Sequence, residues 1–172
     1  MTAQRQESSP SRPGIALISL VAGICLVGPS PGGVWSAAQA ATTERVVVNR
    51  FSGVAIEGFD PLAYFIDGKP AQGSAEFEAS QAGAVWRFQN EGNRASFLAH
   101  PEVYGPQFGG YDPTDVARGI AVAGNPRFFA ISAQRLYLFS LEANRDAFAA
   151  NPGRFLDEAR KRWPALQDGL SQ

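Results

Sequence analysis

Cysteine is almost absent from this chain. Its 172 residues contain one cysteine, Cys25, which lies inside the apolar run 15–27 near the N-terminus. A lipoprotein signal would need a small residue directly before that cysteine, but Ile24 stands there. Once residues 1–40 are removed, as argued below, no thiol is left. This excludes a disulfide, a thiolate nucleophile and a thiolate metal site, so stability must come from packing alone.

Histidine and long apolar runs are equally scarce. His100 is the only histidine, so a closed tetrahedral zinc site would need mostly carboxylate ligands, which is unusual. The apolar run 15–27 is shorter than the roughly 20 residues that a membrane-spanning helix requires. We therefore expect no stable membrane anchor after the leader is cleaved.

The first forty residues have the parts of an export signal. A polar region with Arg5 and Arg12 precedes the apolar run, and a segment rich in glycine, proline and serine leads to Ala38-Gln39-Ala40. This small-x-small pattern is what a signal peptidase cleaves. We predict a signal peptide over 1–40, cleavage after Ala40, and a periplasmic or secreted single domain over 41–172.

The charge of that domain is close to neutral. The leader holds Arg5, Arg12 and Glu7, which leaves 13 Lys plus Arg (15 minus 2) against 15 Asp plus Glu (16 minus 1), a net charge of −2. Such a balance disfavours binding to nucleic acid or to an anionic membrane through charge. Partners are expected to be a small ligand or another protein.

An internal repeat organises the domain. Residues 85–104 read VWRFQNEGNRASFLAHPEVY, and residues 136–155 read LYLFSLEANRDAFAANPGRF. Seven of the twenty aligned positions are identical, namely Phe88/Phe139, Glu91/Glu142, Asn93/Asn144, Arg94/Arg145, Phe97/Phe148, Ala99/Ala150 and Pro101/Pro152. Two copies are too few for a solenoid. We predict an α+β fold in one domain, with small antiparallel hairpins that are each followed by a short helix.

The two pseudo-repeated halves are expected at about 75–104 and 127–155. Alternating residues predict hairpin strands at 75–80 with 84–88, and at 128–131 with 136–139. The polar residues Asn90, Ser140 and Asn151 are expected to cap the helices that follow, the last of which should run through Trp163. The repeated aromatic residues alternate with the strand pleat and the helix face, which indicates core positions.

Residues 105–126 form the linking loop between the copies. This segment holds five glycines and three prolines, and a long loop of that composition is often functional. Tyr111, Asp112 and Asp115 are its candidate ligand-binding residues, because a glycine-rich approach lets the backbone come close while carboxylates supply charge. The alternative is structural: Asp112 caps a short helix and Asp115 lies in its first turn.

Three stretches together resemble the YHS-domain family, in particular its exported bacterial single-domain members. They are GFDPLAYFIDGKPAQGSAEF, WRFQNEGNRASFLAHPEVYGPQFGGY and RLYLFSLEANRDAFAANPGRF, and they cover nearly all of the mature chain. The resemblance implies a small α+β module related to metal-handling domains. Metal-type members carry cysteines near the start of the repeat helix, which here are Gln89, Asn93, Ser140 and Asn144. Asp112 likewise stands where exported members have cysteine.

Several roles follow for the candidate residues. A bound metal ion would be a hard cation, with Asp112 and His100 as its candidate ligands. His100 is also a candidate helix cap, because Asn151 occupies its place in the second copy. Arg94 and Arg145 are expected to pair with a carboxylate such as Glu57 or Asp60.

The functional hypotheses belong to different classes. The leading one is an exported non-catalytic binding or accessory module that holds a metal ion or small ligand near residues 109–115. One alternative is an enzyme that uses Asp112 and Tyr111 in a cleft. The other is a structural partner protein whose metal site has decayed. No serine or cysteine triad and no phosphate loop can be assembled from the sequence, so no catalytic residue is assigned.

Overall fold

The computed structural model describes residues 45–170, all within one structural unit that spans 38–172. The predicted leader, with Cys25 and the cleavage site after Ala40, lies outside the described residues. Within residues 45–170, no helix combines the length and apolar character needed to cross a membrane.

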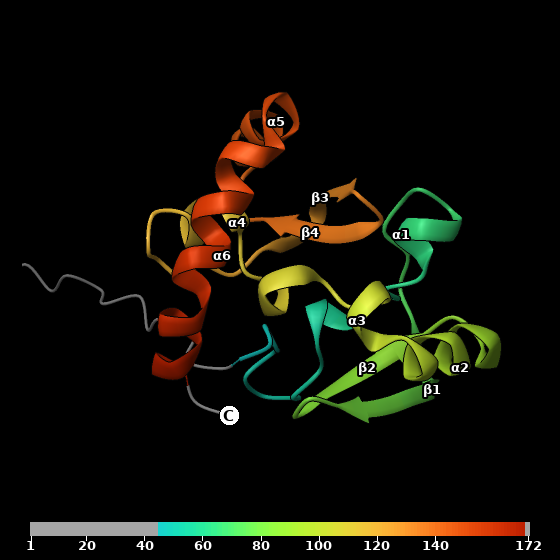
Figure 1. The fold of residues 1–172 in the computed structure, drawn as a ribbon. Coiled ribbons are helices and arrows are strands. Elements are labelled where there is room, and N and C mark those ends of the chain that lie inside the picture. The colour runs from blue at the N-terminus through green and yellow to red at the C-terminus, as the bar shows by residue number, and fades with distance from the viewer. Residues whose placement is uncertain (1–44, 171–172) are drawn as a thin grey trace, which may run out of the picture. The chain divides into compact units, whose positions relative to one another are not determined.

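Two separate antiparallel hairpins form the strands of the fold (Figure 1). The first pairs β1 (Ser74–Gln81) with β2 (Ala84–Phe88), and the second pairs β3 (Asn125–Ser132) with β4 (Arg135–Phe139). The register shifts at the same place in each first strand, between Ser74 and Glu78 and between Asn125 and Phe129. Each hairpin is followed by a helix, so the predicted α+β class is confirmed.

The helices after the hairpins begin at different kinds of residue. Before α2 (Glu91–Ala99), the Asn90 side chain accepts a hydrogen bond from the Asn93 backbone N–H at 2.9 Å, as expected of a cap. Before α5 (Glu142–Ala150) the capping position is Leu141, which makes no side-chain cap bond. The prediction that Ser140 caps this helix is therefore wrong, because its hydroxyl is engaged elsewhere.

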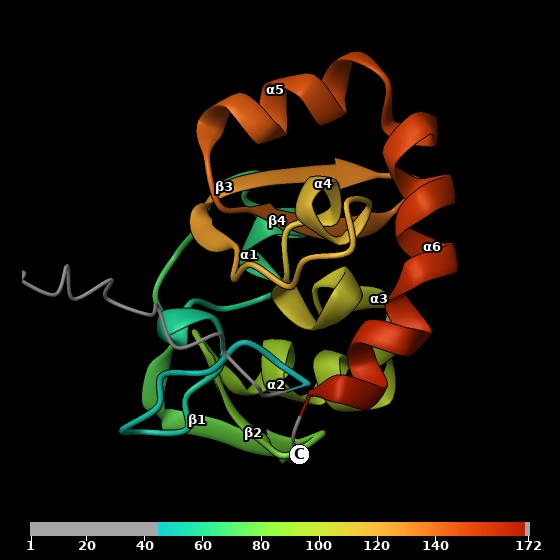
Figure 2. The same cartoon turned by 90° about the vertical axis from the view of Figure 1, so that its left-hand side faces the viewer.

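Each of these helices is followed at once by another. These are α3 (Pro101–Tyr104) and α6 (Pro152–Gly169), and the Asn151 side chain caps α6 by accepting from the Arg154 N–H at 3.2 Å. Figure 2 shows α2 beside the first hairpin, α5 beside the second, and α6 leading away from α5. The last helix runs through Trp163, as predicted, and continues past Pro164 to Gly169.

Residues 105–126 are a second copy of an earlier stretch. A tight turn at Ile56–Gly58 (η1) precedes α1 (Ala63–Ile66), and a matching turn at Gln107–Gly110 (η2) precedes α4 (Pro113–Val116). Each turn holds three successive residues at positive φ: 42°, 55° and 80° for Ile56, Glu57 and Gly58, and 54°, 62° and 89° for Phe108, Gly109 and Gly110. We call these two triplets the left-handed turns.

Backbone pairing after the left-handed turns is also duplicated. The Asp60 N–H bonds the Ala71 carbonyl at 2.8 Å, and the Asp112 N–H bonds the Val122 carbonyl at 2.9 Å. The linking segment 105–126 therefore shares these local features with the stretch that precedes the first hairpin. The first half of the fold spans residues 54–104 and the second half spans residues 106–169.

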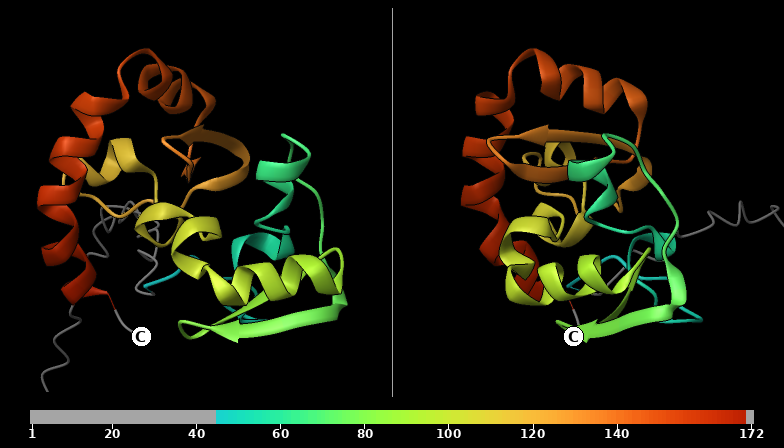
Figure 3. Two further views of the ribbon diagram at one scale, coloured as in Figure 1. Left: turned by 45° about the vertical axis from the view of Figure 1, so that its right-hand side comes forward. Right: turned by 90° about the vertical axis from the view of Figure 1, so that its right-hand side faces the viewer.

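The core joins the two halves. Leu136 and Leu138 of β4 belong to the same buried cluster as Trp86, Phe88 and Phe97 of the first half. The repeated aromatic residues predicted to be core are buried: Trp86, Phe88, Phe97, Tyr137, Phe139 and Phe148. The side views in Figure 3 show α1 lying toward the second hairpin. There the Tyr64 hydroxyl donates to the Pro126 carbonyl at 2.9 Å, and the Tyr64 and Phe129 rings meet edge to face.

Candidate functional site

A fully buried aspartate in the first half ties α1 to the start of α2. One carboxylate oxygen of Asp60 accepts from the Leu62 N–H at 2.8 Å. The other oxygen accepts from the Gln89 N–H at 2.8 Å and from the Asn93 side-chain amide at 2.6 Å. Asp60 thus connects the turn before the hairpin to the helix after it.

Asp112 repeats this arrangement in the second half. It is also fully buried, and its Oδ1 accepts from the N–H and the hydroxyl of Thr114, both at 2.8 Å. Its Oδ2 accepts from the Ser140 N–H at 2.8 Å, from the Ser140 hydroxyl at 2.9 Å and from the Asn144 amide at 2.7 Å. We call Asp60 and Asp112, with these donors, the two aspartate staples.

The second staple contains an additional carboxylate. Asp115, which is 5% exposed, lies with its Oδ2 3.1 Å from the Ser140 hydroxyl and 3.4 Å from the Asn144 amide. Its Oδ1 pairs with the guanidinium of Arg118. The serine hydroxyl has one hydrogen and donates to one aspartate at a time, whereas the asparagine amide has two hydrogens and can serve both.

These bonds decide how the predicted ligand residues are used. Five donors occupy the Asp112 carboxylate, so it caps α4 and holds the following hairpin, as the structural alternative for this residue requires. Tyr111 is fully buried, with its ring 5.9 Å from that of Trp163. Neither residue lines either of the two cavities described below.

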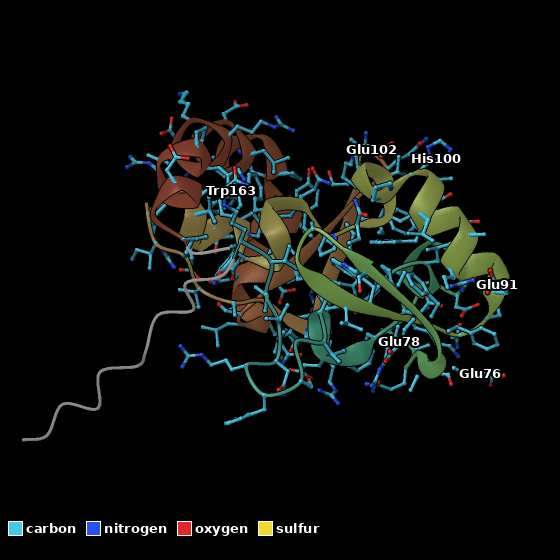
Figure 4. The ribbon with its side chains drawn as sticks, turned by 90° about the horizontal axis from the view of Figure 1, so that it is seen from below. Glu76, Glu78, Glu91, His100, Glu102 and Trp163 are labelled. Carbon is cyan, nitrogen blue, oxygen red and sulfur yellow. The ribbon has the colours of Figure 1, made fainter. Side chains whose placement is uncertain are left out.

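His100 lies apart from the staples, on the surface. Its side chain is 63% exposed, with Nδ1 3.6 Å from a carboxylate oxygen of Glu102. It occupies the N-cap position of α3, but its side chain makes no cap bond there and lies on the surface instead. Figure 4 shows His100 and Glu102 together at the α2–α3 junction, well separated from Trp163 on α6.

The described part of the chain contains no group of side chains that could form a metal site. Among residues 45–170, no three His, Cys, Asp or Glu side chains converge on a point that could hold a metal ion. The positions at which the resemblance implies ligands carry amides and a hydroxyl instead. Asn93, Ser140 and Asn144 each donate a side-chain hydrogen bond to a staple aspartate.

The repeated arginines pair within their own helices. Arg94 bonds Glu91 through two contacts of 2.8 Å, and Arg145 bonds Glu142 and Asp146 at 2.9 Å each. The hydrogen bond from Arg94 lowers the pKa of Glu91 below its ordinary value. The expected partners, Glu57 and Asp60, are wrong. Asp60 instead accepts a hydrogen bond from Asn93, the residue before Arg94.

The larger cavity lies beside Gly109. Its volume is about 550 Å³, and its lining residues come from four places in the chain: Arg45, Val46, Val48, Ala82, Gly83, Gly109, Trp163 and Gln167. We call it the Arg45 cavity. The Trp163 and Phe108 rings pack edge to face, with ring centroids 5.7 Å apart, so neighbours fix the orientation of Trp163.

The segment that carries Arg45 runs between the two left-handed turns. The Val47 N–H bonds the Gly109 carbonyl at 2.8 Å, and the Val47 carbonyl accepts from the Ile56 N–H at 3.2 Å. A side chain at Gly109 would overlap the Arg45 carbonyl oxygen, so this close approach requires glycine. Val47 therefore links both halves, and the glycine positions one wall of the Arg45 cavity.

Arg45 itself has an unusual environment. Its Nε is buried and has no hydrogen-bond partner among the described residues. Among residues 45–170, it is also the only charged side chain that lines the cavity. A buried donor without a partner is rare in folded proteins, because its desolvation is then not compensated.

A second cavity lies beside the same segment and shares Val48 with the first. It has a volume of about 330 Å³ and is lined by residues that include Val47, Phe51, Ile56 and Pro126. It has a smaller volume than the Arg45 cavity, and two opposite charges, Arg50 and Glu57, lie at its wall.

The sequence did not single out Arg45 or Trp163. The usable signal was Gly109, because a glycine-rich segment indicates close backbone approach, but the sequence does not show that residues 45–48 are what approaches it. Trp163 reads as one more apolar residue of an amphipathic helix. Comparison with protein-family models, with curated proteins and with solved structures found no match, so the resemblance to the YHS family stays a prediction.

Proposed function

We propose that the mature chain is an exported, non-catalytic YHS-like binding module that holds one small organic molecule in the Arg45 cavity. The observation that carries this proposal is the cavity itself. Its volume of about 550 Å³ lies within the roughly 300–1,000 Å³ typical of small-molecule sites. Its lining is mostly apolar with two polar side chains, Arg45 and Gln167, which is the usual composition of such sites.

The walls of this cavity are well supported. Gly109 belongs to a left-handed turn that Val47 bonds, and Trp163 projects from the eighteen-residue helix α6. Ala82 and Gly83 form the tight turn between β1 and β2. A site built on such elements keeps its shape before the ligand arrives, which reduces the entropic cost of binding.

Nothing in the described residues favours the enzyme hypothesis over this one. Asp112 has its acceptor positions filled by backbone and side-chain donors, and Tyr111 is buried against Trp163. A general base must reach a substrate proton directly or through one water. Neither residue lines a cavity in which a substrate could meet it.

A cavity-filling variant tests the proposal. Gln167 lines the Arg45 cavity near the end of α6, whereas its neighbour Asp168 is exposed and does not. The mature chain would be titrated with 2-naphthoate and 2-naphthamide by isothermal titration calorimetry. We expect saturable binding of at least one probe at a stoichiometry of one, lost in Gln167→Trp and kept in Asp168→Trp.

Thermal stability serves as the control for both variants. Thermal unfolding of the two variants should match the wild type within a few degrees, because neither position is in the core. Absence of saturable binding of either probe to the wild type would refute the proposed site. Equal binding to wild type and Gln167→Trp would place the probe elsewhere and would also refute it.

A further inference from the structure

We propose that the ligand of the Arg45 cavity is an organic acid, whose anionic group pairs with the Arg45 guanidinium while its flat apolar body lies against Trp163. This inference rests on the proposed function and adds the chemical class of the ligand. Two observations lead to it: Arg45 is the charged side chain at the cavity wall among the described residues, and Trp163 lies at the same wall.

Arg45 forms no ion pair with a carboxylate among the described residues. Within residues 45–170, carboxylates pair with other arginines, such as Arg87 with Glu78 at 2.8 Å and Arg118 with Asp115, but none pairs with Arg45. Its buried Nε also has no hydrogen-bond acceptor there. A guanidinium presents its donors in a planar fork that matches the two oxygens of a carboxylate. Because Arg45 lines the cavity, we place the anionic group of the ligand beside its guanidinium.

The charge of the lining points the same way. Of the residues that the structure describes, Arg45 is the single charged one at the cavity wall, and none of their carboxylates lines it. The mature chain has a net charge of −2, so the cavity concentrates positive charge on a protein that is weakly acidic. Ion pairing is stronger in a partly enclosed site than in open water, because the effective dielectric constant is lower.

The remaining lining defines the rest of the ligand. Trp163 offers a large aromatic surface held in place by Phe108 and Tyr111, with ring centroids 5.7 and 5.9 Å away. Val46 and Val48 add apolar contacts, and the Gln167 amide can donate or accept one further hydrogen bond. This lining fits a molecule with an aromatic or aliphatic body and an acidic end.

A matched probe pair tests this class of ligand. 2-Naphthoate and 2-naphthamide share one ring system and differ in charge. The protein would be expressed with its own leader, and the exported mature chain would be titrated with each probe at low salt by calorimetry. We expect 2-naphthoate to bind at least about tenfold more tightly than 2-naphthamide. A charge-assisted pair is roughly twice as strong as a neutral hydrogen bond, and tenfold corresponds to about 1.4 kcal/mol.

Variants at Arg45 assign that preference to its side chain. In Arg45→Met the preference for 2-naphthoate should fall to about twofold or less, while 2-naphthamide binds as before. Arg45→Lys keeps the charge but loses the planar fork, so its preference should be intermediate. Arg50→Met is the matched control, because Arg50 lies five residues further along the chain and does not line this cavity.

The outcomes separate the two proposals. If both probes bind the wild type equally, the ligand class is wrong and the binding function stands. If neither binds, the proposed function fails and this inference fails with it. If 2-naphthoate is preferred but Arg45→Met and Arg45→Lys keep the full preference, Arg45 does not recognise the anion and the inference is overturned.

Discussion

At the scale of single residues, the staple aspartates explain why an Asp-Pro dipeptide stands before each short helix. The dipeptide starts the helix, but its carboxylate also reaches forward to the asparagine of the helix after the hairpin, Asn93 or Asn144. Removing either aspartate would leave buried backbone N–H groups without an acceptor. Such orphaned donors are costly because they have lost water and gained nothing.

Asp112→Asn is expected to destabilise the protein strongly. An asparagine has one acceptor oxygen in place of two, and its amide hydrogens would face the donors of either Thr114 or Ser140. We expect a loss of about 3 kcal/mol in the free energy of unfolding, measured by urea denaturation. The control is Asp146→Asn, since the Asp146 side chain is 65% exposed and a surface ion pair contributes about 1 kcal/mol or less.

Equal losses in these two variants would show that the buried carboxylate is replaceable. Asp60→Asn should fall between them, because Asp60 accepts three hydrogen bonds where Asp112 accepts five. The sequence predicted the capping role of Asp112 from its neighbours. It did not predict Asn144 as a partner, because that contact spans 32 residues and depends on how the hairpin folds back.

At the scale of elements, the left-handed turns set where each half begins. Ile56 and Phe108 have positive φ without being glycine, a conformation that costs roughly 1–3 kcal/mol. In both halves the turn leads directly to the staple aspartate and the short helix that follows it. In the second half it also brings Gly109 against the backbone of Arg45.

Gly109→Ala is expected to cost much more than a conformational penalty. Gly109 and Gly68 have nearly the same positive φ, 62° and 64°, but a methyl group would overlap the Arg45 carbonyl at the first and meet no atom within 4 Å at the second. Gly68→Ala should therefore lower the free energy of unfolding by about 1 kcal/mol. Gly109→Ala should lower it by about 3 kcal/mol or more.

Chemical denaturation of both variants measures this difference, and a similar loss in both would mean that segment 45–48 moves aside freely.

The sequence predicted the hairpins and helices because their periodicity and caps are local. It missed the repeated turns because few residue types recur in them. In addition, the offset between copies changes from 52 residues at Asp60/Asp112 to 51 at Asn93/Asn144, which breaks an ungapped alignment.

At the scale of the whole unit, the two halves are not independent. Leu136 and Leu138 of the second half are buried in the cluster of the first, and Val47 bonds both left-handed turns. Alignment of the two copies of the internal repeat predicted two halves but not the interface between them. The alignment shows the residues that the copies share, whereas the interface is made by residues that differ between the copies. Tyr64, whose counterpart is Val116, is one such unshared residue.

Tyr64 gives the interface a dependence on alkaline pH. Burial, with a smaller contribution from the Glu57 charge, raises the pKa of Tyr64 well above its ordinary value near 10. Its hydroxyl also donates to Pro126 of the other half. Above about pH 10 the unfolded chain releases this proton while the folded protein keeps it. The stability that depends on the neutral phenol is therefore present below pH 10 and is lost as the pH rises further.

Comparison with Tyr64→Phe isolates this effect. Below pH 10 the wild type should be more stable by about 1 kcal/mol, the usual contribution of one hydrogen bond. Between about pH 10 and 11.5 its free energy of unfolding should fall more steeply than that of the variant, by up to about 1.4 kcal/mol per pH unit. Urea denaturation across this range measures both slopes. Parallel slopes would mean that the phenol ionises as readily in the folded protein as in the unfolded chain, and that the halves meet without enclosing it.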